Sequence, residues 1–140
     1  MQIIKVAVPV PLRRVFDYLP AGQMPKRGCR VKVPFGARQM VGVVLDISEH
    51  SLLDPAKLKP INSIVDQRPI LDETIMSLCE WASGYYHHPI GEVFATALPV
   101  LLRQGEPAEL RHEQYWQLTE AGTALDLSTI KKAPRQVLLI

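Results

Sequence analysis

One acidic residue stands among basic and aromatic residues near the start of the chain, in the segment Phe16-Asp17-Tyr18 that follows Arg13-Arg14. A carboxylate accepts hydrogen bonds and donates none. It could accept one from a terminal 3′-hydroxyl of a nucleic acid, whereas an internal nucleotide would bring a phosphate whose charge the carboxylate repels. Aromatic neighbours stack on a base whatever its identity. The segment therefore suits a site that recognises the end of a strand.

The same acid also has a purely structural explanation, a salt bridge from Asp17 to Arg13 or Arg14. Both explanations stay open on chemistry alone. Strand geometry adds a constraint, because alternate side chains of a strand point to opposite faces. If this segment is a strand, Phe16 and Tyr18 share one face and Asp17 lies on the other, unless the strand turns there.

Two further positions could complete such a site. Gly36 follows an expected strand, and a glycine there allows a ligand or another backbone to come close. Lys59 lies just before the last expected strand and could contact a phosphate, with Lys57 as the alternative. The structural explanations are a tight hairpin at Gly36 and an ordinary surface lysine at Lys59.

Positive charge is concentrated at the beginning of the chain. Residues 1–40 carry eight bases and one acid, a net charge of +7, and the remaining residues carry eight bases and thirteen acids, −5. A basic lobe of this kind suits a polyanionic partner such as nucleic acid. Arg13, Arg14 and Arg38 are the candidate phosphate contacts, and a solvated surface is the alternative.

The sequence shows no catalytic motif. It lacks a Gly-rich loop with the Lys and Ser or Thr that bind nucleotide phosphates. The cluster Tyr85-Tyr86-His87-His88 is the one candidate metal site, but adjacent helical histidines point in different directions and no further ligand lies at suitable spacing. We expect a helix end there, with Trp81 and both tyrosines packed on the strand lobe. We predict no enzyme activity, no catalytic residue and no metal ligand for this chain.

Cysteine usage and hydropathy bear on the compartment. Cys29 and Cys79 stand far apart in unrelated local sequence, which fits neither a disulfide framework nor a zinc site. We predict two reduced, partly buried thiols in a cytoplasmic protein. The longest apolar stretches are too short to span a bilayer, and the N-terminus lacks the pattern of a secretory signal.

Short strands are expected to position these residues. Alternation and turn residues predict strands over residues 3–10, 15–19, 30–35, 40–48 and 61–65. Gly42 predicts a bulge or sharp bend in the fourth strand. In the third, alternation places Arg30 and Lys32 outward. Several short strands separated by turns favour a small barrel over a parallel sheet.

The period then changes to that of helices. Apolar residues recur at three- and four-residue steps from Asp72, a good N-cap, to Tyr86. A second helix is expected from about Gly91 until Pro99 ends it. Residues 106–113 are polar and predict a linker. Beyond it a strand is expected over 115–118 and the start of a helix over 133–140, as the beginning of a second, truncated domain.

Four runs in this order carry a resemblance to a known family: Val8-Pro9-Val10-Pro11-Leu12 through Phe16-Asp17-Tyr18; Gly28-Cys29-Arg30-Val31-Lys32-Val33-Pro34-Phe35-Gly36; Tyr85-Tyr86-His87-His88-Pro89-Ile90-Gly91-Glu92; and Ala97-Leu98-Pro99 with Leu101-Leu102-Arg103-Gln104-Gly105. In order and spacing, roughly residues 3–105 resemble the N-terminal region of the PriA family of primosomal replication-restart helicases, also called primosomal protein N′.

The resemblance implies an α+β fold with a small OB-like β-barrel over about residues 1–66 and a helical part over about 70–102. Residues 114–140 would begin a winged-helix domain. It further implies a DNA-binding module that captures the 3′-hydroxyl end of the nascent leading strand at stalled forks and D-loops and helps initiate primosome assembly. The pocket positions would be Phe16, Asp17, Tyr18, Gly36 and Lys59, without base preference and with Asp17 on the 3′-hydroxyl.

The resemblance also implies what lies outside the chain. Full-length members are ATP-dependent 3′–5′ DNA helicases whose motor would follow Ile140. ATP, magnesium and zinc are therefore expected only in the full-length protein, and no cofactor in this chain. Other primosome proteins and single-stranded DNA-binding protein would be partners through the full-length chain, and the location would be cytoplasmic, at the nucleoid. The rival hypothesis is a protein–protein docking module of the primosome.

Overall fold

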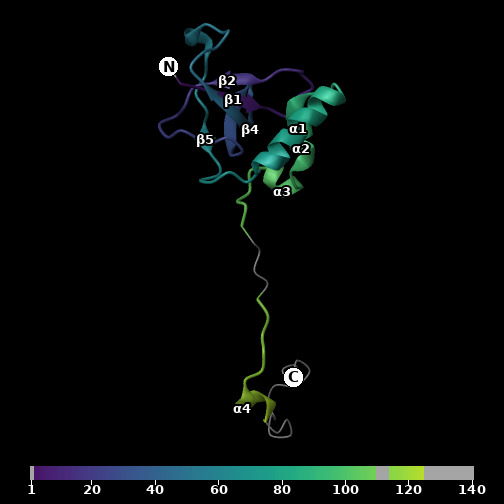
Figure 1. Ribbon diagram of the computed structural model, residues 1–140. Helices are drawn as coiled ribbons and strands as arrows, with labels where there is room; N and C mark the ends of the chain where they lie inside the picture. Colours follow the sequence, from purple (N-terminus) through teal and green to yellow (C-terminus); the bar gives the residue numbers. More distant parts are fainter. Residues whose placement is uncertain (1, 110–113, 125–140) are drawn as a thin grey trace. The chain divides into compact units, whose positions relative to one another are not determined.

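The computed structural model describes residues 2–109 and 114–124. The chain divides into two compact units, Met1–Glu109 and Leu110–Ile140. The sheet and the first three helices belong to the first unit (Figure 1). The predicted division into a domain, a linker at 106–113 and a second domain stays a prediction.

The first unit contains a five-stranded antiparallel sheet with the strand order β2-β1-β4-β3-β5. The strands are β1 Ile3–Ala7, β2 Phe16–Tyr18, β3 Arg30–Phe35, β4 Arg38–Ser48 and β5 Ser63–Ile64. β1 ends earlier than the predicted Val10. Pro9 and Pro11 lack the backbone N–H that a strand ladder needs, and the Val10 N–H turns back to the Val8 carbonyl at 2.8 Å.

The two edges of the sheet approach each other beside the candidate pocket. Leu19, which follows β2, forms a parallel bridge with Pro60, which precedes β5. The Leu19 N–H donates to the Lys59 carbonyl and the Ile61 N–H donates to the Leu19 carbonyl, both at 2.9 Å. This seam places Lys59 next to the end of β2. The predicted α+β class is confirmed, and closure into an OB-like barrel remains a prediction.

The predicted bulge at Gly42 is found at Leu45 instead. The register between β1 and β4 shifts after Lys5, which pairs with Asp46, so Leu45 is the additional residue. Gly42 serves another purpose. A Cβ at that position would lie 2.5 Å from the Val6 side chain, so the glycine lets β1 and β4 approach closely.

Three helices follow the sheet, α1 Glu73–Tyr85, α2 Ile90–Ala97 and α3 Val100–Arg103. The predicted cap of α1 is confirmed, because Asp72 Oδ1 accepts a hydrogen bond from the Ile75 N–H at 2.9 Å. Pro89 and Pro99 precede α2 and α3. The three helices lie together at one side of the sheet (Figure 1).

Both faces of the sheet are apolar. One buried cluster lies among the strands and comprises Ile4, Val6, Val8, Val10, Phe16, Tyr18, Val31, Val33, Val44 and Ile61. A second cluster joins the sheet to the helices and comprises Ala7, Val43, Leu45, Leu71, Met76, Cys79, Phe94 and Leu98. The second cluster contains no residue of β2. The helices therefore do not pack on β2 through this cluster, and β2 can contribute to a site away from them.

Arg30 is buried, so the prediction that it points outward is wrong. Its guanidinium donates to both carboxylate oxygens of Asp66, at 2.6 and 2.9 Å, and to the Leu102 carbonyl at 2.6 Å. A buried charge is tolerated when it is paired and hydrogen-bonded. Asp66 is 36 residues away, so strand alternation alone could not reveal this partner. The ion pair ties β3 to the segment after β5, and the bond to the Leu102 carbonyl ties β3 to α3.

In the second unit, the described residues 114–124 contain the short helix α4, Glu120–Thr123, and no strand at the predicted 115–118. That prediction is wrong. Strands are stabilised by pairing, and no ladder to these residues exists in the described part of the unit. The predicted helix at 133–140 and most of the predicted winged-helix start lie outside the described residues. Within the described residues, no helix is both long and apolar enough to cross a membrane.

Candidate functional site

A cavity of about 520 Å³ opens where β2, the end of β3 and the loop after β4 meet. This volume falls within the range of about 300–1,000 Å³ that is usual for ligand sites. Its lining residues come from segments distant in the sequence: Lys5, Arg14, Val15, Phe16, Asp17, Tyr18, Pro34, Phe35, Gly36, Leu52, Leu53, Lys57 and Lys59. The structure therefore brings all five predicted pocket residues to one cavity.

The Asp17 carboxylate has a partner on each oxygen. The strand register places Asp17 directly opposite Lys5, and Lys5 Nζ lies 3.3 Å from Asp17 Oδ1. Ser51 Oγ donates to Asp17 Oδ2 at 2.6 Å. The salt bridge that the sequence suggested with Arg13 or Arg14 is thus formed with Lys5. The Asp17 side chain keeps 12% of its surface exposed, so the carboxylate borders the cavity.

Phe16 and Tyr18 face the buried cluster among the strands, as the alternation in β2 predicts. The Phe16 ring meets the Phe35 ring edge to face, with centroids 5.1 Å apart. The Tyr18 hydroxyl donates to the Pro34 carbonyl at 3.1 Å, and burial raises the pKa of Tyr18. These contacts fix β2 against the end of β3, so that both strands contribute to one wall of the cavity.

Arg14 is the candidate phosphate contact that lines this cavity. Its guanidinium lies 4.8 Å from the centroid of the Phe16 ring, a cation–π arrangement that holds a planar cation at the wall. Arg13 lines a neighbouring cavity of about 280 Å³, which Arg14 borders as well. Arg38 is exposed at the start of β4, opposite Phe35 in the strand register. A phosphate-binding role for these arginines stays a prediction.

Gly36 lies in the tight turn between β3 and β4. Its φ of 59° is in the left-handed region, which glycine adopts without steric cost. A Cβ there would meet nothing within 4 Å. The hairpin alone therefore explains why a glycine stands at this position. Gly36 also lines the cavity, but that location is not needed to explain the glycine.

Both lysines that the sequence left open line the cavity. Lys57 ends the short 3-10 helix Pro55–Lys57, whereas the backbone of Lys59 is held by the hydrogen bond from Leu19. Leu58 between them is buried. Together with Lys5 and Arg14, they place four cationic side chains beside one carboxylate among the described lining residues. A ligand that combines a hydroxyl with phosphates fits this charge distribution.

Lys5 and Ser51, the two partners of Asp17, were not predicted from the sequence. Lys5 interrupts an apolar strand, and that signal could have been used, because cross-strand ion pairs are common where two strands pair. Ser51 is 34 residues from Asp17, in a polar loop. No local pattern points to it, so the sequence alone offered no signal.

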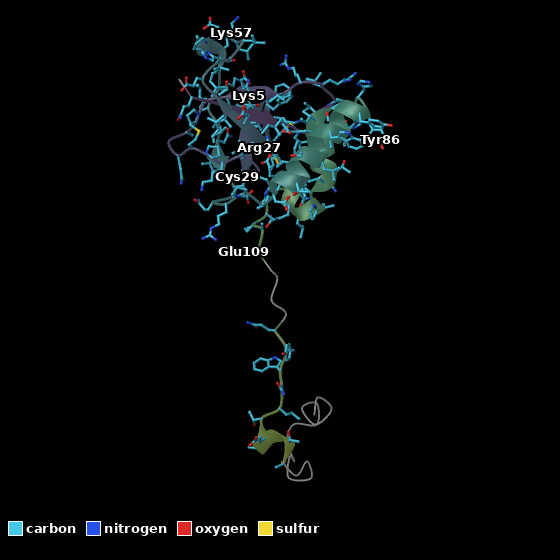
Figure 2. All side chains as sticks on the ribbon, in the orientation of Figure 1. Lys5, Arg27, Cys29, Lys57, Tyr86 and Glu109 are labelled. Atoms are coloured by element: carbon cyan, nitrogen blue, oxygen red, sulfur yellow. The ribbon has the colours of Figure 1, made fainter. Side chains whose placement is uncertain are left out.

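The aromatic cluster on α1, comprising Trp81, Tyr85 and Tyr86, is exposed, which contradicts the prediction that it packs on the strands. Its members are 55%, 66% and 68% exposed, respectively. They contact one another instead: Trp81 stacks on Tyr85 with centroids 5.0 Å apart, and Tyr85 meets Tyr86 edge to face at 4.9 Å. Met76 and Cys79 form the buried side of α1. At 100° per residue, Trp81 and Tyr85 lie on the opposite side. Figure 2 shows Tyr86 on the outer side of the helices, away from Lys57.

His88 and the two cysteines have structural contacts and form no metal site among the described residues. His88 Nε2 lies 3.0 Å from Glu92 Oε2, one turn further along. Among the described residues, no group of three or more His, Cys, Asp or Glu side chains is arranged to hold a metal ion. Cys29 and Cys79 form no disulfide with each other and are buried more fully than the predicted partial burial. Burial raises the pKa of both thiols.

The sheet and the helices define a small α+β domain with a cationic cavity at one sheet edge. A family model described as the 3′DNA-binding domain (3′BD) of PriA matches residues 5–99. The chain belongs to this family of PriA 3′DNA-binding domains.

Curated relatives agree with this assignment. The replication restart protein PriA of Haemophilus influenzae is 38% identical over 138 residues, which cover 97% of this chain and 19% of that protein. The protein of the same name from Buchnera aphidicola subsp. Acyrthosiphon pisum is 29% identical over 141 residues, covering 100% and 19%. The one from Bacillus subtilis is 35% identical over 89 residues, covering 59% and 11%. The chain thus spans about a fifth of the length of the first two relatives.

Proposed function

We propose that this chain binds the 3′-hydroxyl end of a DNA strand in the cavity beside Asp17. The observation that carries the proposal is the charge arrangement there, one carboxylate and four cationic side chains lining the same cavity. Membership of a 3′DNA-binding domain family supports DNA as the ligand. The arrangement suits an end rather than an internal nucleotide, because only an end offers a hydroxyl to the carboxylate.

In the proposed complex, the Asp17 carboxylate accepts a hydrogen bond from the terminal 3′-hydroxyl. A 3′-phosphate at the same place would meet that negative charge and be repelled. Lys59, Lys57 and Arg14 are available on the lining for the phosphate on the 5′ side of the terminal nucleotide. Contacts to phosphate and sugar carry no sequence information, so the site would accept any terminal base.

In a longer protein of this family, the captured end would be that of the nascent leading strand at a stalled fork or D-loop. The domain would then hold the DNA while the rest of the protein initiates primosome assembly. Helicase activity, ATP, magnesium and zinc would belong to that remainder. So would the contacts with other primosome proteins and with single-stranded DNA-binding protein. The location would be the cytoplasm, at the nucleoid.

The exposed aromatic cluster supports a second candidate function, a docking module for another primosome protein. Clustered exposed aromatic side chains commonly mark interaction sites, and Trp81, Tyr85 and Tyr86 form such a cluster on α1. The two candidates use different surfaces. A docking module would lose partner binding on Trp81→Ala and would ignore the chemistry of a DNA end.

The test compares oligonucleotides of one sequence that end in a 3′-hydroxyl or a 3′-phosphate, by fluorescence anisotropy at a fixed salt concentration. We expect tighter binding of the hydroxyl end by about tenfold or more, the size of one hydrogen bond to a charged group. Equal affinity for both ends would contradict end recognition. The Trp81→Ala variant is the control and should keep the wild-type preference, because the aromatic cluster does not line the cavity.

A further inference from the structure

We infer that the Ser51 hydroxyl and a terminal 3′-hydroxyl compete for the same acceptor, the Asp17 carboxylate, so that Ser51 sets how tightly a DNA end binds. The inference rests on the proposed function and adds a residue to it. It makes the loop that carries Ser51, residues 49–57, part of the binding equilibrium.

The first support is the chemistry of the contact. Ser51 Oγ donates to Asp17 Oδ2 at 2.6 Å, within the range of about 2.5–2.7 Å typical of a hydroxyl on a carboxylate. The other oxygen faces the Lys5 ammonium at 3.3 Å. Ser51 is thus an aliphatic alcohol on a carboxylate held by a lysine. A sugar 3′-hydroxyl is also an aliphatic alcohol, and it would make the same type of bond.

The second support is the weak attachment of the loop. Residues 52–57 are all exposed, and Leu52 and Leu53 have exposures of 105% and 49% although both line the cavity. The next buried side chain is that of Leu58. The internal bonds of the loop are local: the Leu53 N–H donates to Ser51 Oγ at 3.0 Å, and the Ala56 N–H donates to Asp54 Oδ1 at 3.0 Å. Ser51 can therefore leave Asp17 without uncovering apolar core.

Competition of this kind also selects among ligands. A hydroxyl that offers nothing else gains no more from Asp17 than Ser51 already does. A DNA end brings phosphate and sugar contacts together with its hydroxyl, so it can displace Ser51 where a simple alcohol cannot. Ser51 would then protect the carboxylate from unspecific hydroxyl ligands.

The alternative to competition is that Ser51 positions Asp17 for the DNA end. A carboxylate oxygen has two lone pairs, so Ser51 could stay in place and orient Asp17 for the DNA end. Removal of the hydroxyl would then weaken binding of the hydroxyl end. Competition predicts that the same change strengthens it.

The test measures Ser51→Ala against the 3′-hydroxyl and 3′-phosphate oligonucleotides. We expect about threefold to tenfold tighter binding of the hydroxyl end, the equivalent of one net hydrogen bond. Binding of the phosphate end should stay within about twofold, because that end makes no bond to Asp17. Ser51→Thr keeps the hydroxyl and should retain the wild-type affinity.

Ser48→Ala is the matched control for loosening of the loop. Ser48 Oγ donates to the His50 carbonyl and accepts from the His50 N–H, both at 3.1 Å, and it does not line the cavity. We expect no change in affinity for either end. Equal tightening by Ser48→Ala, or unchanged or weaker binding of the hydroxyl end by Ser51→Ala, would overturn the competition. A wild-type protein without preference for the hydroxyl end would contradict the proposed function itself, which separates the two failures.

Discussion

The cations around Asp17 differ in how firmly the backbone holds them. Lys59 is anchored by the bridge to Leu19, whereas Lys57 ends an exposed turn. We predict that Lys59→Ala weakens DNA binding more than Lys57→Ala, because a lysine on an anchored backbone loses less entropy when its side chain binds a phosphate. On single-stranded DNA, the loss of one contact should reduce the magnitude of the salt slope by about 0.7. Titrations of both variants at several salt concentrations measure this, and an equal or reversed order would contradict it.

At the residue scale, the sequence indicated part of the site. The segment Phe16-Asp17-Tyr18 was identifiable because its one acid stands out in a basic lobe. Gly36 and Lys59 were candidates from their places beside expected strands, and the family resemblance then assigned them to the same pocket. All five line one cavity. Ser51 was missed because its contact with Asp17 joins residues 34 positions apart. Such contacts depend on how strands and loops pack, which local spacing does not encode.

At the element scale, α1 presents its aromatic cluster to solvent and its small buried side to the sheet. We predict that Tyr85→Ala changes the free energy of unfolding by at most about 1 kcal/mol, because an exposed ring loses mainly its contacts with other exposed rings. Met76→Ala is the control, since Met76 is 1% exposed and truncation of a buried side chain costs about 2–5 kcal/mol. Urea denaturation measures both. A loss above about 2 kcal/mol for Tyr85→Ala would mean that the ring packs on the strands after all.

Substitution of the glycines in α1 and α2, Gly84 and Gly91, should change the stability of the domain in opposite directions. A Cβ on Gly91, in α2, would lie 1.7 Å from the Val8 carbonyl oxygen, whereas a Cβ on Gly84, in α1, would meet nothing within 4 Å. We predict that Gly91→Ala destabilises the domain by about 1–3 kcal/mol or more, because α2 must move away from the backbone that follows β1. Gly84→Ala should stabilise it by up to about 1 kcal/mol through helix propensity. Thermal melts of the pair test this, and a stable Gly91→Ala variant would contradict the close approach.

Strands with one consistently apolar face were predictable from alternation, and so was the capped start of α1. The errors at this scale share a cause. Apolar residues lie on both sides of α1, so the pattern could not tell which side faces the sheet, and the aromatic cluster was assigned to the wrong one. Arg30 looked like an outward residue because its partner, Asp66, belongs to a loop far along the chain. Residues 115–118 had strand-like composition without a strand to pair with among the described residues.

At the scale of the whole chain, the basic charge lies in the residues that build the sheet and the cavity. We predict that DNA binding weakens as salt is added, because bound lysines and arginines displace counterions from phosphates. For two to four phosphate contacts on a single strand, the logarithm of the association constant should fall with a slope of about −1.4 to −2.8 against the logarithm of salt concentration. Anisotropy titrations across a range of salt concentrations give the slope. A salt-independent affinity would exclude the basic lobe as the binding surface.

The central claim is that the Asp17 carboxylate distinguishes a hydroxyl end from a phosphate end. Asp17→Asn keeps the size and an acceptor oxygen but removes the charge, so we expect lost discrimination more than lost binding. Asp17→Ala also removes the acceptor. It should lower affinity for the hydroxyl end by about tenfold to a hundredfold. Asp17 is partly exposed beside Lys5, so both variants should melt close to the wild type.

The most direct measurement is the ratio of affinities for the 3′-hydroxyl and 3′-phosphate ends in wild type, Asp17→Asn and Asp17→Ala, under one salt condition and alongside a thermal melt. We predict a ratio well above one for the wild type and close to one for both variants. An Asp17→Ala protein that is folded and keeps the wild-type preference for the hydroxyl end would contradict the claim. The Asp17–Lys5 pair would then be a structural contact of β1 and β2.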